Sequence, residues 1–294
     1  MKYSIIIPNL NFPTIDQTIR VLEQQRKPNL SFEVIVVGLD EPGLVKESET
    51  TRFISSIKPI TAAMARSIGS RNATGDILCF MDADCIPCAD WVERVSQWFQ
   101  NPSVNVLGGG VECSDSSFWM KCEYISGFHD YLISTAPGIR KQLPGLNLMV
   151  RRSAYEQAGG FDETLSGSED QDLCFRLLQN GFVLQFDPKV SVDHRPNRRT
   201  AQAVFRRTWW WASHSMTIHP RWRNFLHPAL PLRHRHLLLV LSPLLALGVT
   251  LRIFWSDRTL WRWWYTAPAI FVLKIIWCLA AADGMRLLET YGKV

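Results

Sequence analysis

The N-terminal part of the chain alternates short apolar runs with segments of helical periodicity. Ser4–Pro8, Glu33–Val37 and Ile77–Met81 are compact runs dominated by apolar residues, which is typical of strands buried on both faces. Residues 14–25 repeat apolar side chains every three or four positions, and residues 60–73 are rich in Ala, so both segments are predicted to be helices. Buried strands separated by helices predict an α/β fold with a parallel sheet and helical crossovers.

A second set of elements is predicted between residues 140 and 195. Leu143–Val150 reads as a strand entered through a turn, and Phe182–Phe186 alternates like a strand. Between them, Asp170–Asn180 has helical periodicity, with Ser166-Gly-Ser-Glu169 as a capping box before it and Gly181 as its C-cap. We therefore expect this region to add a helix and two strands to the fold.

The character of the chain changes after residue 200. Leu237–Leu251 is a 15-residue apolar stretch interrupted by Pro243, and Thr266–Ala282 has 17 residues with Lys274 at its centre. Both are shorter than the ~20 residues of an ordinary transmembrane helix. The pattern predicts a C-terminal hydrophobic helical hairpin. It leaves open whether the hairpin crosses a membrane, enters and leaves on one side, lies in the interface or packs within an oligomer.

Charge and tryptophan divide the chain at the same place. Residues 1–200 carry 20 Lys/Arg against 24 Asp/Glu, whereas residues 201–294 carry 12 against 3 and hold 9 of the 12 tryptophans. A basic, Trp-rich segment beside apolar runs indicates a membrane-facing part attached to a soluble body, and the apolar runs argue against nucleic acid as the partner. We expect an α/β domain over 1–204, a basic Trp/Arg/His-rich juxtamembrane segment over 205–235 and a membrane-associated hairpin over 236–294.

Composition and cysteine usage limit the class of protein. With 47% apolar and 20% charged residues, the chain can form a packed core, which excludes global disorder. Its seven cysteines have no regular spacing, and the residues after Met1 lack the apolar stretch of a secretory signal. We therefore expect reduced thiols and a location at the cytoplasmic face of the cell membrane. Cys85 and Cys88 are interpreted as packing thiols, because no second pair has the spacing of a zinc site.

Polar residues gather where the predicted strands end. Pro8–Asn9, Gly38–Asp40 and Asp82–Asp84 each follow one of the three apolar runs, and open α/β sheets bind ligands at the carboxyl ends of their strands. Two carboxylates at positions i and i+2 in such a turn are oxygen ligands suited to Mg²⁺ or Mn²⁺, and these cations also bind diphosphate oxygens. The alternative is an ordinary acidic turn.

Other candidate residues lie outside these strand ends. Glu169 and Asp170 stand at a predicted helix start, where one would act as a general base or both would complement the helix dipole. His194 is interpreted as a metal or phosphate partner, with a structural histidine as the alternative. Arg66, on the helix before the third strand, would reach a diphosphate or solvate a helix face.

Four blocks of the sequence resemble family 2 glycosyltransferases in order and spacing. They are Ser4–Asn11, Ala65–Asp76, Phe80–Asp84 and Gly159–Leu177, so the resemblance covers about residues 1–200. It implies a GT-A fold, which is Rossmann-like, with a mostly parallel central sheet flanked by helices. It also implies a nucleotide-diphosphate sugar as the donor substrate, Mg²⁺ or Mn²⁺ as the metal, and inverting transfer to an acceptor hydroxyl.

The resemblance also implies roles for individual residues. Asp84 is implied as the direct metal ligand and Asp82 as a ligand nearer the ribose. Asp170 is implied as the catalytic base, with Glu169 as the second candidate. The residues implied at the nucleotide-sugar site are Pro8, Asn9, Asp40, Arg66, Asp82 and Asn147.

Two departures from the family pattern shape the expected activity. The usual Asp-Asp-Gly-Ser turn after the second strand is replaced by Gly38–Glu41, which leaves the identity of the nucleotide open. The Gln-x-x-Arg-Trp block of processive members has no match. We therefore predict a membrane-associated, non-processive glycosyltransferase that acts on a lipid-linked or cell-surface glycan precursor, in polysaccharide biosynthesis. The alternatives are a nucleotidyltransferase-like phosphoryl-transfer enzyme and a non-catalytic membrane scaffold.

Overall fold

The chain forms two compact units. The computed structural model describes residues 1–216, 218–226 and 229–291. One unit comprises Met1–Ser114 and Thr135–Pro196, and the other comprises Asp115–Ser134 and Asn197–Val294. The boundary therefore lies earlier than the expected residue 204, and an internal segment joins the C-terminal unit.

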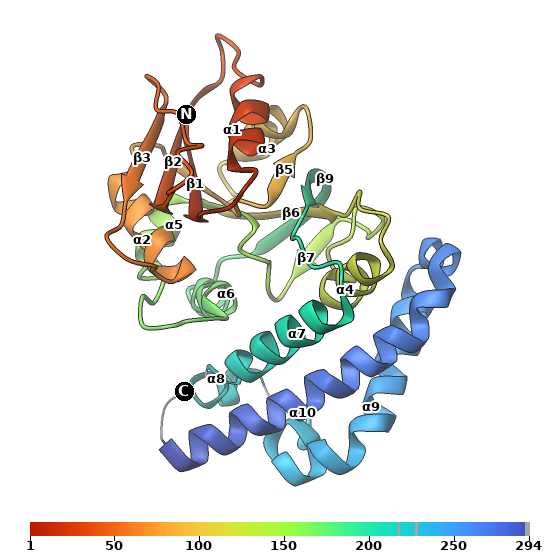
Figure 1. Cartoon of the computed structure of the whole chain (residues 1–294). Coiled ribbons are helices and arrows are strands. Elements are labelled where there is room, and N and C mark those ends of the chain that lie inside the picture. Colours follow the sequence, from red (N-terminus) through yellow and green to blue (C-terminus); the bar gives the residue numbers. More distant parts are fainter. Residues whose placement is uncertain (217, 227–228, 292–294) are drawn as a thin grey trace. The chain divides into compact units, whose positions relative to one another are not determined.

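The first unit is built on one nine-stranded sheet (Figure 1). The strand order is β3-β2-β1-β4-β8-β6-β9-β5, with β7 beside β9. The strands are β1 (Lys2–Leu10), β2 (Ser31–Leu39), β3 (Thr51–Ser55), β4 (Ile77–Met81), β5 (Cys85–Pro87), β6 (Val106–Glu112), β7 (Gly138–Arg140), β8 (Asn147–Arg151) and β9 (Leu184–His194).

The three apolar runs form neighbouring parallel strands of the sheet. β1 pairs in parallel with β2 and β4, and β2 pairs in parallel with β3. Ile5, Ile6 and Ile7 of β1 are completely buried, because helices cover both faces of such a sheet. β8 joins the sheet antiparallel to β4 and β6. The predicted GT-A-like α/β architecture is confirmed.

Helices of the first unit connect and cover the strands. They are α1 (Ile15–Glu23), α2 (Ala62–Asn72), α3 (Trp91–Phe99), α5 (Arg152–Gln157) and α6 (Glu169–Gln179). Gly69 lets α2 lie close to β1, since a Cβ at this position would be 2.4 Å from a side-chain carbon of Ile6. This contact fixes α2 against the strand whose end forms part of the site.

The two ends of α6 differ from each other in how well the sequence predicts them. Gly181 has φ +82 just beyond the helix, as its predicted C-cap role requires. The predicted capping box is wrong, because the N-cap is Ser168, which has φ 60 and makes no capping hydrogen bond with its side chain. The left-handed turn at Ser168 brings Glu169 and Asp170 directly into the first turn of α6.

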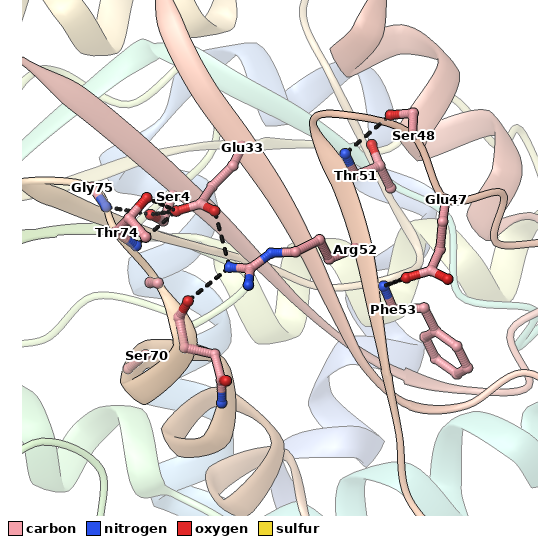
Figure 2. A network of polar contacts seen from close by, with 12 residues as sticks. Ser4, Glu33, Glu47, Ser48, Thr51, Arg52, Phe53, Ser70, Thr74 and Gly75 are labelled. Atoms are coloured by element: carbon pink, nitrogen blue, oxygen red, sulfur yellow. Dashed lines mark hydrogen bonds and ion pairs between the residues drawn. The ribbon is translucent and has the colours of Figure 1, made fainter.

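A buried polar network ties together the amino ends of β1, β2 and the segment before β4 (Figure 2). The Glu33 carboxylate accepts hydrogen bonds from the Ser4 hydroxyl at 2.7 Å and from the Thr74 amide at 2.7 Å, and Arg52 donates to its other oxygen at 3.0 Å. Burial alone would raise the pKa of Glu33, but the hydrogen bonds from Thr74 and Ser4 outweigh it and lower the pKa. The charge of this carboxylate is therefore stabilised in the fold.

The second unit is helical. Its elements are α4 (Phe118–Phe128), α7 (Ala201–Ser215), α8 (His219–Leu226), the 3₁₀ segment η1 (Leu230–Arg233), α9 (Arg235–Ser256), the 3₁₀ segment η2 (Arg258–Thr266) and α10 (Ala267–Tyr291). Cys122 of α4 packs against Val204 of α7 and Leu273 of α10 in one buried cluster. This apolar contact explains why residues 115–134 group with the C-terminal helices.

Two helical stretches are long and apolar enough to cross a membrane. They are Arg235–Ser256 and Arg258–Thr290. The two predicted apolar segments are therefore helices, and each extends beyond its apolar core. Of the 18 most apolar consecutive residues in each stretch, 33% and 39% are buried inside the chain, so most of these residues are not covered by the chain itself.

Candidate active site

The turn after β4 presents two carboxylates. The amide of Cys85 donates to the carbonyl of Asp82 at 3.1 Å, which closes the turn. The Thr18 hydroxyl of α1 lies 3.2 Å from the Ala83 carbonyl and 3.0 Å from the Cys85 carbonyl. A buried hydroxyl therefore fixes the backbone between Asp82 and β5, and it does so without engaging either aspartate side chain.

Strand register brings His194 to Asp84. β5 pairs antiparallel with β9, and Cys85 is opposite His194. The Arg195 amide donates to the Asp84 carbonyl at 2.7 Å. The Asp84 carboxylate then lies 3.3 Å from Nε2 of His194. The structure thus brings together two of the residues predicted to bind a metal, although they are far apart in the sequence.

Arg66 joins the two acidic parts of the site. Its side chain is almost fully buried on α2. One guanidinium nitrogen lies 2.5 Å from Asp82 and another lies 2.5 Å from Glu169. Burial alone would lower the pKa of Arg66, but the facing carboxylates, led by Asp82, raise it, so the guanidinium stays charged. Its Nε–H is buried and has no acceptor within the described part of the chain.

Asp170 lies beside this ion-paired arginine. Its two carboxylate oxygens accept the amide hydrogens of Gly145 and Gln171, each at 2.8 Å. Burial and the neighbouring charge of Glu169 raise the pKa of Asp170 to about 6, despite these hydrogen bonds. Asp170 is therefore held in a fixed orientation and has the raised basicity that a general base requires near neutral pH.

A cavity of about 270 Å³ opens at the carboxyl ends of β1 and β4. It is lined by Pro8, Asn9, Leu10, Phe12, Ile60, Ala62, Ala65, Asp82, Ala83 and Asp84. Apolar walls with two carboxylates at one end suit a ligand that has a flat or apolar part and an anionic part bridged by a cation. Four predicted site residues line this cavity, whereas Phe12 and Ile60 were not predicted because nothing in their sequence context marks them.

Two predicted donor-site residues have other surroundings. Asn147 is completely buried on β8, accepts from the Trp91 indole at 3.1 Å and donates to the carbonyls of Gly110 and Val190 at 3.1 and 2.8 Å. These hydrogen bonds use its amide to join β8 to the neighbouring strands, and its role as a nucleotide-sugar ligand stays a prediction. Asp40 does not line the cavity, and one of its oxygens accepts the Val45 amide at 2.7 Å.

Close packing explains the glycine at the end of β2. Gly38 has φ +135, and a Cβ there would be 2.0 Å from the backbone oxygen of Asn9. The side-chain amide of Asn9 donates to the Leu39 carbonyl at 2.8 Å. The ends of β1 and β2 therefore approach so closely that only glycine fits at this position.

The side chains at the turn suit a metal cation whose remaining coordination positions are filled by a bound ligand. Within the described residues, no three side chains of His, Cys, Asp and Glu are grouped so as to hold a metal by themselves. Asp84 and His194 supply one carboxylate and one imidazole at 3.3 Å, a donor set that divalent cations accept when phosphate oxygens fill the other positions. Cys85 is buried and Cys88 is partly buried, and both are free thiols.

The comparison with known families decides the classification. The model of "Glycosyl transferase family 2" matches residues 4–159. The chain belongs to glycosyl transferase family 2. The match ends before Asp170, so the assignment of the second half of the site rests on its own geometry.

Individual relatives share moderate similarity with this family 2 member. It is 30% identical to the pre-mycofactocin glycosyltransferase of Mycobacterium tuberculosis over 145 residues, which are 47% of this chain and 31% of that protein. It is 26% identical to glycosyltransferase AglE of Haloferax volcanii, covering 69% of this chain and 70% of that protein. The chain thus spans about a third of the length of the first relative.

A solved structure shares the fold. The mannosyltransferase PcManGT from Pyrobaculum calidifontis, in complex with GDP-Man and Mn²⁺, aligns with a TM-score of 0.58 at 21% identity, covering 94% of this chain and 86% of that protein. The similarity supports the GT-A-like architecture of the chain.

Proposed function

We propose that this chain transfers one sugar from a nucleotide-diphosphate sugar to an acceptor hydroxyl, with inversion at the anomeric carbon. The observation that carries the proposal is the placement of Arg66, which pairs with Asp82 on the cavity side and with Glu169 on the side of Asp170. The buried guanidinium of Arg66 therefore connects the proposed diphosphate position with the proposed general base. A scaffold would not need a carboxylate held there with a raised pKa.

The donor would occupy the cavity that Pro8, Asn9 and Phe12 line, with its diphosphate toward Asp82 and Asp84. Mn²⁺ or Mg²⁺ would be held by Asp84 and His194 together with the phosphate oxygens, and Asp82 would lie nearer the ribose. When bound, the cation supplies positive charge that stabilises the departing diphosphate. The buried Nε–H of Arg66 offers a further donor for an anionic group.

Asp170 would take the proton of the acceptor. The acceptor oxygen forms a bond to the anomeric carbon, the bond from that carbon to the diphosphate oxygen breaks, and the hydroxyl proton passes to Asp170. Attack from the face opposite the leaving group inverts the configuration. Gly145 and Gln171 hold both carboxylate oxygens, so the base is oriented before the acceptor binds, and Glu169 adds the negative charge that makes it more basic.

The acceptor is proposed to be lipid-linked or part of a cell-surface glycan, on the cytoplasmic face of a membrane. This proposal rests on the second unit, whose two apolar helical stretches are mostly uncovered by the chain itself. The C-terminal charge excess of 12 Lys/Arg over 3 Asp/Glu also favours an anionic membrane over a neutral surface. Relatives named as glycosyltransferases and the GDP-Man and Mn²⁺ complex of a similar fold support the donor class.

The test is nucleotide-sugar turnover by the purified full chain in detergent. UDP-, GDP- and dTDP-sugars would be screened with Mn²⁺ or Mg²⁺, with and without EDTA, and metal-dependent nucleotide binding would be measured on the same samples. We expect release of one nucleoside diphosphate that EDTA abolishes, that Asp84→Asn removes and that Asp90→Asn leaves unchanged. Asp90 is the matched control, because it is an aspartate that does not line the cavity, stands at the start of α3 and pairs with Arg94. Binding of no nucleotide under any condition would overturn the proposal.

A further inference from the structure

Helix α9 has one face of large apolar side chains that are exposed. Val240, Leu244, Leu247 and Leu251 are all exposed, and Val240 is 75% exposed. Their spacing of three or four residues puts them on one face of the helix. A helix at a water-exposed surface has the opposite arrangement, so this outer face is adapted to a surrounding other than water.

The middle of the inner face of α9 is lined by small or polar side chains. Ser242, Ala246 and Thr250 are buried at four-residue spacing, and Leu238 and Ile253 are buried toward the two ends of the helix. Ser242 donates to the Leu239 carbonyl and Thr250 to the Ala246 carbonyl, both at 2.8 Å, so their hydroxyls are satisfied within the helix. Small residues on this side allow α9 to lie close to α10.

Aromatic and basic residues continue the outer surface beyond α9. Trp255 at its end is 85% exposed, and Trp261 and Trp264 of η2 are also exposed. Arg252 near the end of α9 is 65% exposed and lies 3.7 Å from Asp130 in a surface ion pair, and η2 adds Arg262, which stacks over the Trp263 ring at 4.0 Å. Tryptophans with neighbouring arginines are typical of the headgroup region of a bilayer, where cations also meet anionic lipids.

Helix α10 is not available to cross a bilayer on its own. α7 runs beside it (Figure 1), and a Cβ at Gly284 of α10 would be 2.5 Å from the Ser213 carbonyl of α7. Near the other end of α10, Lys274 donates to the Ser126 carbonyl of α4 at 2.7 Å. A spanning α10 would draw α7 into the hydrocarbon together with Arg206 and Arg207, which is energetically unfavourable.

Helix α9 as a whole is long enough to cross a bilayer, but its exposed apolar surface is shorter than the helix, which favours in-plane binding. This surface extends from Leu237 to Leu251 on α9, which corresponds to roughly 22 Å along a helix. The hydrocarbon core of a bilayer is about 30 Å thick. Charged residues follow at once on both sides, Arg235 before this surface and Arg252 after it.

We propose that the second unit binds an anionic phospholipid bilayer in plane through the outer face of α9, defined by Leu237, Val240, Leu244, Leu247 and Leu251, and does not span it. Trp255, Trp261 and Trp264 lie at the level of the headgroups, and Arg252 and Arg262 contact anionic lipids. This inference rests on the membrane association included in the proposed function, and it names the binding surface, the lipid chemistry and the mode.

Liposome flotation of the full chain tests the surface. The variant Val240→Ser/Leu244→Gln/Leu251→Gln is compared with the control Ile57→Gln/Ile139→Gln/Val183→Ser, whose three positions are exposed apolar residues of the first unit. With vesicles of phosphatidylcholine and phosphatidylglycerol, we expect flotation of the first variant to fall at least about tenfold and that of the control to stay unchanged. Vesicles of phosphatidylcholine alone should bind the wild type less than the mixed vesicles.

Two results would overturn the surface proposal. One is flotation of the first variant equal to the wild type. The other is a wild-type dimer without lipid that the first variant converts to a monomer while no form floats, which would assign the face to a second copy. Because flotation needs no turnover, failure of the proposed transferase activity would not affect this readout. Circular dichroism melting of both variants checks that they are folded.

Labelling of the two ends of α9 tests the mode. His236→Cys and Ser256→Cys are introduced singly with Cys88 and Cys113 changed to Ser, and inverted membrane vesicles from expressing cells are treated with an impermeant maleimide. An in-plane helix exposes both ends on the cytoplasmic side, so both variants should be labelled equally. Labelling of one end alone would show that α9 crosses the bilayer and would overturn the in-plane mode.

Discussion

Two carboxylates of the first unit lie at opposite ends of its parallel strands and have opposite electrostatics. Glu33, at the amino ends, is surrounded by hydrogen-bond donors from Ser4, Thr74 and Arg52, and its pKa is lowered. Asp170 faces the carboxyl ends, where burial and Glu169 raise its pKa to about 6. The surroundings of Glu33 therefore stabilise its negative charge, whereas the surroundings of Asp170 destabilise its negative charge.

The difference follows from the number of donors available to each group. Glu33 has partners that serve no other carboxylate of the network in Figure 2. At the other end, the Arg66 guanidinium is shared by Asp82 and Glu169, which leaves Asp170 with two backbone amides. A site that keeps a carboxylate incompletely neutralised makes that carboxylate more basic and the fold less stable. The region around Glu33 therefore contributes to stability, and the region around Asp170 is suited to proton transfer.

Removal of the base should have the largest effect on activity. Asp170→Asn keeps a side-chain oxygen that can accept the amide hydrogen of Gly145, but the new side chain cannot take the proton of the acceptor hydroxyl. We expect turnover to fall by about 10²- to 10⁴-fold, with the donor dissociation constant changed only a few fold, because general base catalysis acts on the chemical step. Steady-state kinetics and calorimetric donor binding measure the two quantities. Unchanged turnover would remove Asp170 from the mechanism.

A smaller loss is expected from crowding the base. A Cβ at Gly145 would be 3.1 Å from the Cβ of Asp170 and 3.2 Å from the guanidinium carbon of Arg66. Gly145→Ala should therefore shift one of these groups by a few tenths of an ångström and lower kcat roughly tenfold, since catalytic groups tolerate little displacement. Gly127→Ala is the control, because its added Cβ would meet no atom within 4 Å. Equal kcat in both variants would contradict the proposed geometry.

The matched change at the amino ends should affect stability instead. Glu33→Gln removes the charge that Thr74, Ser4 and Arg52 stabilise, and we expect the free energy of unfolding to fall by about 1–3 kcal/mol. Turnover per folded molecule should stay at the wild-type level. Chemical denaturation and kinetics on the same preparation measure both. A large loss of turnover without a loss of stability would mean that this network acts in catalysis.

The smallest expected effect is the opposite pH dependence of the two contributions to stability. Glu33 has a lowered pKa, so its contribution is present above the ordinary value of 4.5 and is lost as pH falls through the folded value. Asp170 has a raised pKa, so its ionisation destabilises the fold progressively from the ordinary value of 3.8 to about 6. The unfolding free energies should therefore diverge from the wild type in opposite directions, below pH 4.5 for Glu33→Gln and between pH 3.8 and about 6 for Asp170→Asn. Parallel curves would contradict the assigned electrostatics.

Sequence patterns predicted those parts of the fold and site that depend on local order along the chain. The buried strands follow from apolar runs, and the turn at Asp82 and Asp84 follows from its position after one of them. The start of α6 was correctly placed at Glu169 and Asp170, although the capping box there was wrong, because the backbone adopts a left-handed turn at Ser168. The roles of these residues in transfer remain predictions.

Features that depend on contacts between residues far apart in the sequence could not be predicted in the same way. The contact of His194 with Asp84 requires the register of β5 on β9, and a single sequence does not reveal that register. Asn147 is a polar residue near the predicted site, but its side-chain amide is hydrogen-bonded to Trp91 and to two backbone carbonyls. The assignment of residues 115–134 to the second unit depends on packing of Cys122 against Val204, which no local pattern indicates.

The pH dependence of turnover tests the central claim that Asp170 acts as the base. With the donor identified, kcat/KM would be measured from about pH 5 to about pH 8 for the wild type, Asp170→Asn and Glu33→Gln. The account predicts that wild-type and Glu33→Gln activity falls as the pH drops through about 6, where Asp170 becomes protonated, and that the residual activity of Asp170→Asn lacks this fall. The same fall in Asp170→Asn, or a flat wild-type profile, would contradict it.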